Sequence, residues 1–325
     1  MEGCESEMSV KEYVLSPQAL VMVQGSSKGT QPKYYEKGFW YKVNNLGYEG
    51  YSEYLVSKVL ECSNVDSYVK YEQCTINGRA GCRSKSFIRE NESFLSFQRL
   101  YDLLTGESLQ ERIRLISEVA DRIGFVRKFV LENTGWDCSM YLSQILALDM
   151  LTLNTDRHFN NLGLIVDAST GVYKAAPIFD NGNSLLSDWD RFDEETVEEN
   201  LEKVYGQPFS ASLEMQAREA GIGLMVDYEK LLCILEKEPV SRGLEVLMYQ
   251  LKRYHNIIPD YKMQQENELE QVAPEQKAPD FHREADKNNR TVMVLRWIQR
   301  CVWRFLIVGI KTLISWDFNT CVLLI

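Results

Sequence analysis

The feature that most constrains this chain is a polar eight-residue segment, NTDRHFNN, at residues 154–161. A second short segment, FDNG, begins at Phe179, so that Asp180 follows Asn161 by nineteen residues. Phosphoryl transfer needs a carboxylate beside the acceptor hydroxyl and oxygen ligands that hold Mg²⁺ on the nucleotide phosphates. An Asp-x-x-x-x-Asn loop and a later Asp supply these groups. The spacing therefore predicts that Asp156 orients or deprotonates the acceptor and that Asn161 and Asp180 bind the metal.

The N-terminal part of the chain has the composition of a small antiparallel sheet. Residues 10–90 contain short runs rich in Tyr, Val, Phe and Lys that are separated by Gly, Asn and Ser. Within them, residues 51–61 (YSEYLVSKVLE) place apolar side chains at helical spacing, with Ser52 as the expected N-cap. We therefore expect a sheet that is interrupted by one helix.

The region that follows has mainly helical periodicity. Residues 93–150 contain stretches whose apolar side chains form one stripe, and helical spacing returns up to about Tyr254. Between these regions, two short apolar runs, LGLIV and YKAAPIF, flank a turn at residues 168–171 and predict two strands. The sequence thus predicts an α+β fold with two lobes, a small β-rich N-terminal lobe and a larger helical C-terminal lobe.

Composition divides the chain into four segments. The N-terminal lobe is expected at residues 1–90 and the helical lobe at residues 91–262. Residues 263–290 are polar, carry two prolines and show no apolar period, so they predict a linker. Residues 291–325 form a basic amphipathic tail, for which we weigh weak contact with a membrane surface against packing on the helical lobe or no role.

Charge and cysteine usage exclude several classes of function. The 36 Lys and Arg residues against 47 Asp and Glu residues give a formal net charge of −11, which argues against a general nucleic-acid binder because phosphate contacts need clustered cations. The eight cysteines show no CxxC pair and no zinc-type spacing, so we interpret them as free thiols. The N-terminal residues MEGCESEMSV lack the basic and apolar runs of a signal peptide. We expect a cytoplasmic protein.

The polar loop resembles the corresponding loop of HipA-like kinases. Members of that family carry T-D-x-H-x-x-N followed by a short F-Y/F-D segment, which TDRHFNN at residues 155–161 and IFD at residues 178–180 match. The resemblance implies a protein-kinase-like fold in which Asp156, His158 and Asn161 are catalytic and ATP and Mg²⁺ lie between the lobes. For His158 we weigh a bond to a backbone carbonyl, which would fix the loop, against direct proton transfer.

The N-terminal region contains a second, weaker match. GTQPK at residues 29–33 resembles the G-x-Q-x-K loop that covers the nucleotide in this family and can be phosphorylated on a hydroxyl. The nucleotide-contacting residues implied by the resemblance are Gly29, Thr30, Gln31 and Lys33. The segment is not a Walker loop, because Thr30 stands where that motif needs its second glycine. We weigh autophosphorylation here against an ordinary turn.

The strand and helix after this loop supply a charged pair. Lys42 is the one cation in the apolar run FWYKV, where a kinase fold keeps the lysine that contacts the α- and β-phosphates; the alternative is a snorkelling lysine. The resemblance implies that Glu53, near the start of the next helix, pairs with Lys42, with Glu49 as the fallback. Ile88, in the segment FIRE, falls where the adenine-binding hinge would lie.

The resemblance spans roughly residues 20–255 and implies transfer of the γ-phosphoryl group to Ser or Thr hydroxyls of a protein substrate, or of the chain itself. Phosphatidylinositol 3- and 4-kinases share D-R-H-x-x-N, so a lipid or small-molecule kinase is one alternative. A pseudokinase is another, although the intact acidic and lysine residues argue against it. About two dozen residues precede Gly25, so the resemblance is nearer the compact CtkA-type members, and antitoxin docking and formation of a DNA complex are not carried over.

Overall fold

The computed structural model describes residues 10–21, 31–192 and 196–262. Four of the predictions fall elsewhere. Gly29, Thr30, the linker at residues 263–290 and the basic tail at residues 291–325 lie outside the described residues.

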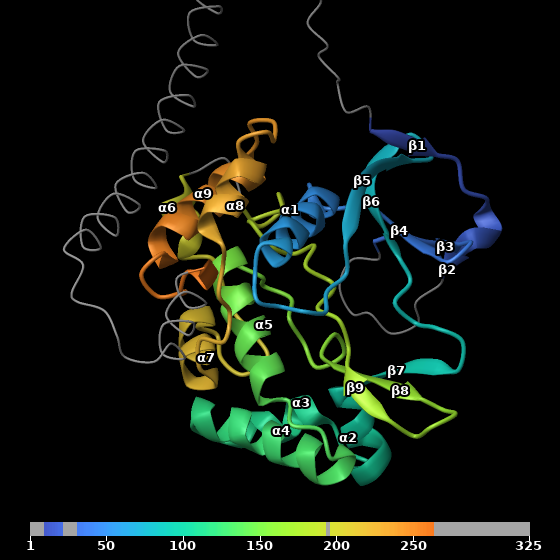
Figure 1. Cartoon of the computed structure of the whole chain (residues 1–325), viewed down its shortest axis with the longest axis vertical. Coiled ribbons are helices and arrows are strands. Elements are labelled where there is room, and N and C mark those ends of the chain that lie inside the picture. The colour runs from blue at the N-terminus through green and yellow to red at the C-terminus, as the bar shows by residue number, and fades with distance from the viewer. Residues whose placement is uncertain (1–9, 22–30, 193–195, 263–325) are drawn as a thin grey trace, which may run out of the picture.

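A six-stranded sheet forms the N-terminal part of the molecule, at the upper right of Figure 1. Neighbouring strands are antiparallel except β1 and β5, which are parallel. In sheet order the strands are β1 (Lys11–Tyr13), β5 (Tyr71–Ile76), β6 (Arg79–Lys85), β4 (Phe39–Val43), β3 (Lys33–Glu36) and β2 (Leu20–Val21), with a short 3-10 helix, η1 (Pro17–Ala19), before β2. The turn Asn77-Gly78, with φ of 50° and 76°, fits the tight hairpin between β5 and β6 because such turns need positive φ at both central residues.

One helix, α1 (Glu49–Glu61), packs against β5 and β6, as the sequence predicts. The helix begins two residues before the predicted segment, and Ser52 does not cap it. Glu49 instead accepts hydrogen bonds from the backbone N–H groups of the loop at residues 45–47, at 2.6–3.3 Å. Ser52 lies inside the helix, buried, and its hydroxyl donates to the Ser184 carbonyl at 3.0 Å. The cap prediction was wrong because the helix begins at Glu49, which puts Ser52 inside its first turn, and Asn44 Oδ1 accepts the N–H of Gly50 at 2.8 Å.

The helical part of the molecule surrounds one long helix, α5 (Ser139–Thr152) (Figure 1). Most of this helix is apolar and buried in the main core, as expected for a helix with almost no solvent face. The other helices are α2 (Phe97–Thr105), α3 (Leu109–Arg114), α4 (Val119–Thr134), α6 (Val197–Leu201), α7 (Leu213–Ala220), α8 (Tyr228–Leu235) and α9 (Arg242–Tyr254). Their order after the sheet confirms the predicted α+β class.

A second, three-stranded sheet lies beside the helices, in the order β7 (Glu92–Ser96), β8 (Gly163–Asp167), β9 (Tyr173–Ala175). The two strands predicted on either side of the 168–171 turn are β8 and β9, although β9 ends before Pro177. The helical region predicted from residue 93 begins only at Phe97. Residues 92–96 pair with β8 as a strand, and Ser96 then caps α2 through the N–H of Arg99.

Among the described residues, no helix is both long and apolar enough to cross a bilayer. The five cysteines within them, Cys62, Cys74, Cys82, Cys138 and Cys233, are free thiols, and only Cys233 is exposed.

Candidate active site

Lys42, on β4, lies at the centre of the candidate site. Its ammonium group forms ion pairs with Glu53 of α1 and with Asp180, the latter at 2.6 Å, and it lies over the ring of Tyr71. Burial alone would lower the pKa of Lys42, but the carboxylates of Asp180 and Glu53 outweigh it and hold the pKa well above its usual range. Lys42 is therefore a charged, nearly buried cation rather than a snorkelling surface lysine.

A close approach of α1 to the sheet brings Glu53 to Lys42. A Cβ on Gly50 of α1 would lie 2.7 Å from the Gly81 carbonyl carbon, and a Cβ on Gly81 would lie 2.2 Å from the Lys42 carbonyl oxygen. Glycine at position 50 therefore lets α1 approach β6, and glycine at position 81 lets the backbones of β6 and β4 approach each other. Glu53, rather than Glu49, is the partner of Lys42, as the resemblance implied.

Asp180 follows Lys42 by 138 residues in the sequence and enters the site from the segment after β9. Pro177 follows β9, and the backbone of Ile178 then bonds with Ser67 and Val69 just before β5, which directs Phe179 and Asp180 under the sheet. Asp180 has a left-handed backbone, with φ of 61°, and its side chain is 31% exposed. This conformation is uncommon outside glycine and occurs most readily for Asn and Asp.

The carboxylate of Asp180 remains ionised in this setting. Burial raises its pKa, but the charge of Lys42, and then that of Lys33, outweigh burial and hold the pKa well below its usual range. Lys33 pairs directly opposite Lys42 in the β3 and β4 register, so both side chains start from the same face of the sheet. Two lysines and an ionised aspartate thus share this side of the molecule. Gln31 is half-buried and lies two residues before Lys33, the first residue of β3.

The loop that contains Asp156 lies beside the Asp180 segment. The N–H of Thr155 donates to the Asn183 carbonyl at 3.1 Å. The side-chain amide of Asn183 donates to Asp156 Oδ2 at 3.1 Å, and that of Gln207 donates to Asp156 Oδ1 at 3.2 Å. Each carboxylate oxygen of Asp156 is therefore held by one amide. The sequence pointed to neither amide residue, and Gln207, 51 positions away, carries no motif signal.

Asn161 closes the same loop. Its amide nitrogen donates to the Asp156 carbonyl at 3.3 Å, and its Oδ1 accepts the N–H of His158 at 3.0 Å. A second lone pair on Oδ1 stays available for a cation. The imidazole Nδ1 of His158 is buried and finds no hydrogen-bond partner within the described residues. The bond to a backbone carbonyl that we weighed for His158 is not made by this nitrogen.

Arg157 faces away from Asp156 and into the core, where it is fully buried. Its guanidinium bonds the carboxylate of Asp149 on α5 at 2.9–3.2 Å, the Phe179 carbonyl at 2.8 Å and Asn181 Oδ1 at 2.6 Å. Asn181 in turn donates its N–H to the carboxylate of Glu53 at 2.8 Å. A continuous set of bonds therefore joins the loop, the Asp180 segment and α1.

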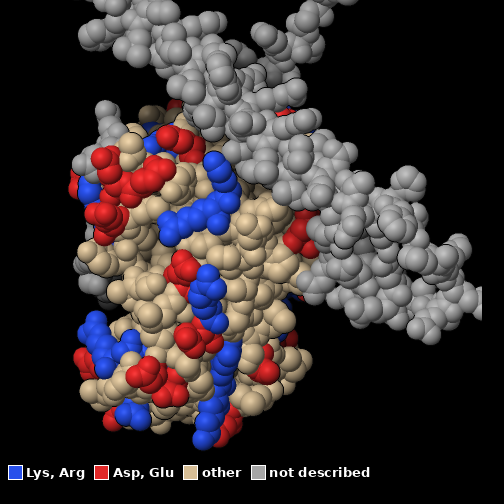
Figure 2. Space-filling view, turned by 90° about the vertical axis from the view of Figure 1, so that its left-hand side faces the viewer, with Lys and Arg blue, Asp and Glu red and all other residues tan. Residues whose placement is uncertain are grey.

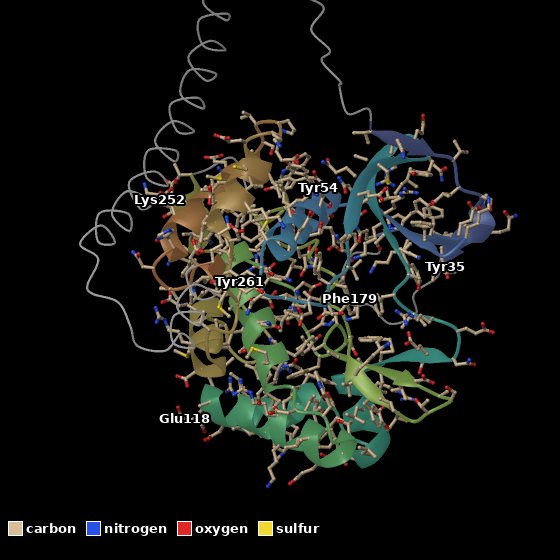
Figure 3. All side chains as sticks on the ribbon, viewed as in Figure 1. Tyr35, Tyr54, Glu118, Phe179, Lys252 and Tyr261 are labelled. Atoms are coloured by element: carbon tan, nitrogen blue, oxygen red, sulfur yellow. The ribbon has the colours of Figure 1, made fainter. Side chains whose placement is uncertain are left out.

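Aromatic side chains border the Asp180 segment on the other side. The rings of Phe87, Phe94 and Phe179 lie 5.2–6.1 Å apart, and Phe179 lies at the junction of the sheet and the helical part (Figure 3). Ile88, the predicted hinge residue, is half-buried next to Phe87 in the connection between β6 and β7. These side chains supply an apolar wall of the kind that a nucleobase packs against.

The donor set suits Mg²⁺ held jointly by protein and phosphate. Mg²⁺ typically takes one or two carboxylates together with substrate phosphates and water. Asp180 is ionised and partly exposed, and Asn161 offers a carbonyl oxygen. Within the described ranges, no group of three or more His, Cys, Asp or Glu residues could hold a metal alone. The residues therefore fit a cation that arrives with a nucleotide.

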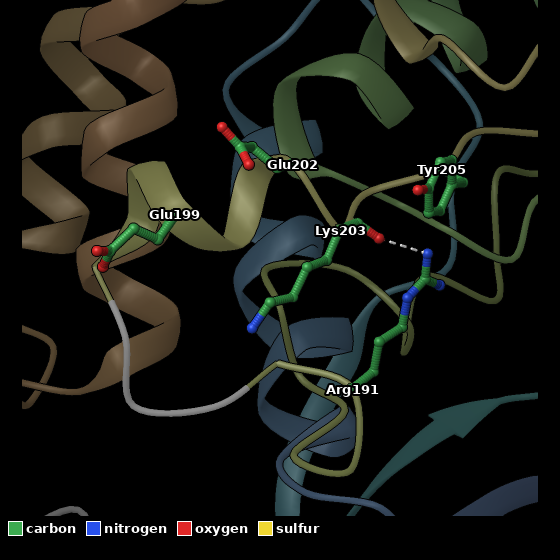
Figure 4. A pocket seen from close by; sticks show the side chains of 5 residues that line it. All are labelled: Arg191, Glu199, Glu202, Lys203 and Tyr205. Atoms are coloured by element: carbon green, nitrogen blue, oxygen red, sulfur yellow. Dashed lines mark hydrogen bonds between the residues drawn. The ribbon is translucent and has the colours of Figure 1, made fainter.

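A separate cavity of 660 Å³ lies outside this site (Figure 4). It is lined by Arg191, Glu199, Glu202, Lys203 and Tyr205, and Arg191 donates to the Lys203 carbonyl at 2.7 Å. None of the predicted site residues lines it, and its mixture of acidic and basic side chains indicates no single class of ligand.

Comparison with solved structures identifies the fold. The proinflammatory kinase CtkA of Helicobacter pylori is 17% identical, with a TM-score of 0.53 over 74% of this chain and 94% of that chain. A HipA chain from the HipA, HipB and operator DNA complex of Shewanella oneidensis MR-1 is 14% identical, with a TM-score of 0.34 over 85% of this chain and 64% of that chain. No family model and no curated protein matches the sequence. The chain has the HipA-like kinase fold that the sequence resemblance predicted.

Proposed function

We propose that this protein is an ATP- and Mg²⁺-dependent kinase that transfers the γ-phosphoryl group to Ser or Thr hydroxyls of protein. One observation carries the proposal. Lys42, Glu53 and Asp180 form one ionic cluster, and the hydrogen-bonded loop of Asp156 lies directly beside the Asp180 segment. The kinase-like fold supports the same reading, because these are the groups through which such a fold handles phosphate.

The side chains divide the work of the reaction between them. The acceptor hydroxyl oxygen forms a bond to the γ-phosphorus, the bond from that phosphorus to the β,γ-bridging oxygen breaks, and ADP leaves. The hydroxyl proton passes to Asp156, whose carboxylate Asn183 and Gln207 hold in place. Lys42 and Lys33 offset the phosphate charge. Positioning and charge neutralisation account for most of the rate gain in this reaction class.

Asp180 and Asn161 are the residues that would hold Mg²⁺. A bound ion would supply positive charge against the nucleotide phosphates. In the structure described here, Asp180 pairs with Lys42, so its carboxylate is already oriented toward the group that would contact phosphate. Gln31 and Ile88 are proposed to contact the nucleotide as well, from the N-terminal loop and from the connection between the sheets.

The charge of the protein favours a protein acceptor over a phosphoinositide. The formal net charge is −11. On the face that carries α6, α7 and α9, Lys and Arg side chains lie among Asp and Glu side chains (Figure 2). Anionic headgroups bind to clusters of several Lys or Arg residues, and this face presents both signs instead. Repulsion by the acidic total adds to that disadvantage.

The test is an acceptor screen with γ-labelled ATP and Mg²⁺. The acceptors are a panel of unrelated proteins, phosphatidylinositol vesicles and small alcohols, and self-labelling is scored in the absence of an acceptor. We expect label on Ser or Thr of protein, with Asp156→Asn lowering transfer by about 10²- to 10⁴-fold, the usual contribution of such a base. Label on lipid or small alcohols alone would identify the other kinase class. Mg²⁺-dependent nucleotide binding without any transfer would identify a pseudokinase.

A further inference from the structure

The buried side chain of Arg157 makes contacts that the proposed chemistry does not use. Its guanidinium bonds the residues on both sides of Asp180, namely the carbonyl of Phe179 and the side chain of Asn181. The remaining bonds go to Asp149, which is itself fully buried on α5. Arg157 therefore anchors the flanks of Asp180 to the most buried helix of the molecule.

The position of Arg157 in the chain gives this contact its significance. Arg157 directly follows Asp156, and the two side chains point to opposite sides of the loop. Asp156 turns toward the side-chain amides of Asn183 and Gln207, and Arg157 turns into the core. A displacement of the Asp180 segment is therefore transmitted through the guanidinium to the backbone next to Asp156.

The backbone of Asp180 needs such support. Its φ of 61° lies in the left-handed region, which costs free energy for a residue with a Cβ and persists where the surroundings fix it. Arg157 fixes the peptide before Asp180 and the side chain after it, while Glu53 accepts the N–H of Asn181. Fixing both neighbours holds the carboxylate of Asp180 at the place where it meets Lys42.

We propose that Arg157 is a positioning residue that sets the distance between the metal-binding Asp180 and the acceptor-side Asp156. The proposal rests on the proposed function of the site. It predicts that loss of the guanidinium raises the Mg²⁺ concentration needed for nucleotide binding in a protein that still folds. Outer partners of metal ligands typically contribute about 10- to 100-fold to metal affinity or activity.

A purely structural role for Arg157 predicts a different result. Buried ion pairs are often replaced by apolar residues without loss of stability, whereas removal of one partner is strongly destabilising. If Arg157 served only to pair with Asp149, the double change Arg157→Met and Asp149→Leu would restore both stability and activity. If it positions Asp180, the double change restores stability alone.

The experiment measures two quantities in the same proteins. One is the free energy of unfolding, and the other is the Mg²⁺ concentration that gives half-maximal binding of a non-hydrolysable ATP analogue. The variants are Arg157→Lys, which keeps a charge beside Asp149, the double variant Arg157→Met with Asp149→Leu, and Asn181→Ala, which leaves the Arg157–Asp149 pair intact. Arg127→Met is the control, because Arg127 bonds backbone carbonyls of Ser139 and Ala220 away from the site.

We expect the Mg²⁺ requirement to rise about 10-fold or more in Arg157→Lys and in the double variant, and less in Asn181→Ala, whatever their stability. Arg127→Met should lose stability and keep the wild-type Mg²⁺ requirement. A Mg²⁺ requirement that follows stability across all variants, or that stays at the wild-type value, would overturn the inference. If the double variant does not fold, Asn181→Ala replaces it: a raised Mg²⁺ requirement supports the inference, and a wild-type requirement overturns it. Failure of the wild-type chain to bind the analogue with Mg²⁺ would instead refute the proposed function.

Discussion

Two ionic clusters meet at the Asp180 segment, and they differ in how completely their charged groups are hydrogen-bonded. Arg157 and Asp149 are fully buried, and the guanidinium bonds a carboxylate, a carbonyl and a side-chain amide oxygen. In the other cluster, Lys42 is shared between two carboxylates, and Asp180 keeps 31% of its side chain exposed. A fully buried ion pair stabilises the fold, whereas a partly exposed ion pair can exchange its protein partner for a ligand.

This difference indicates that one cluster stabilises the fold and that the other can bind ligands. Lys42 and Asp180 have spare donor and acceptor capacity that a phosphate and a cation would use, whereas all three side-chain nitrogens of Arg157 already donate to buried protein oxygens. The two clusters meet at Asn181, which bonds Arg157 through its side chain and Glu53 through its backbone. The residue between the clusters thus connects the rigid anchor to the ligand-binding groups.

The largest effect on stability is expected from breaking the buried cluster. Asp149→Ala leaves the guanidinium of Arg157 in the core without its counter-charge. The free energy of unfolding should fall by about 3–5 kcal/mol, as is typical when one partner of a buried ion pair is removed. Chemical denaturation of the variant checks this. A loss below about 1 kcal/mol would show that Arg157 is not held by Asp149.

A smaller effect is expected from moving α1 away from the sheet. Gly50→Ala puts a Cβ against the backbone of Gly81, and such overpacking typically costs about 1–3 kcal/mol. Because the same displacement moves Glu53 away from Lys42, nucleotide binding should weaken as well. Gly124→Ala, on α4, is the control, since a Cβ there meets nothing within 4 Å. Equal nucleotide affinity in both variants would separate the helix packing from the Lys42 cluster.

The smallest effect is expected from titrating the open cluster. The pKa of Asp180 is lowered in the folded protein, so its contribution to stability is present above the unfolded value of 3.8 and is lost as the pH falls below it. The pKa of Lys42 is raised, so its contribution is present below 10.5 and is lost at higher pH. The difference in unfolding free energy between wild type and Asp180→Asn should therefore be constant between about pH 5 and 9 and shrink in acid. A constant difference down to pH 2 would contradict the ion pair.

Much of the site could be predicted because its residues lie in contiguous patterns. The loop at residues 154–161 and the segment at Asp180 are short motifs, and Lys42 is a lone cation inside an apolar strand. The structure pairs Glu53 with Lys42, as the resemblance implied, and also pairs Asp180 with Lys42, a contact that the sequence did not predict. The α+β order of elements followed from the change of hydrophobic period along the chain.

The rest depended on contacts that sequence spacing does not show. Gln207 reaches Asp156 from a distant loop, and no periodicity links the two. Asp149 did carry a signal, since a charged residue in the apolar run SQILALDML needs a buried partner. The motif did not identify that partner, because Arg157 occupies a variable position of T-D-x-H-x-x-N. The strand at residues 92–96 was missed for a similar reason, since its pairing with β8 is decided by residues 163–167.

The most direct test of the central claim compares nucleotide binding and phosphoryl transfer in the wild-type chain, Asp156→Asn and Asp180→Asn, with γ-labelled ATP and Mg²⁺. The account predicts that Asp156→Asn binds the nucleotide as the wild type does and transfers phosphate about 10²- to 10⁴-fold more slowly, whereas Asp180→Asn loses both Mg²⁺-dependent binding and transfer. Equal transfer in all three proteins would contradict the account.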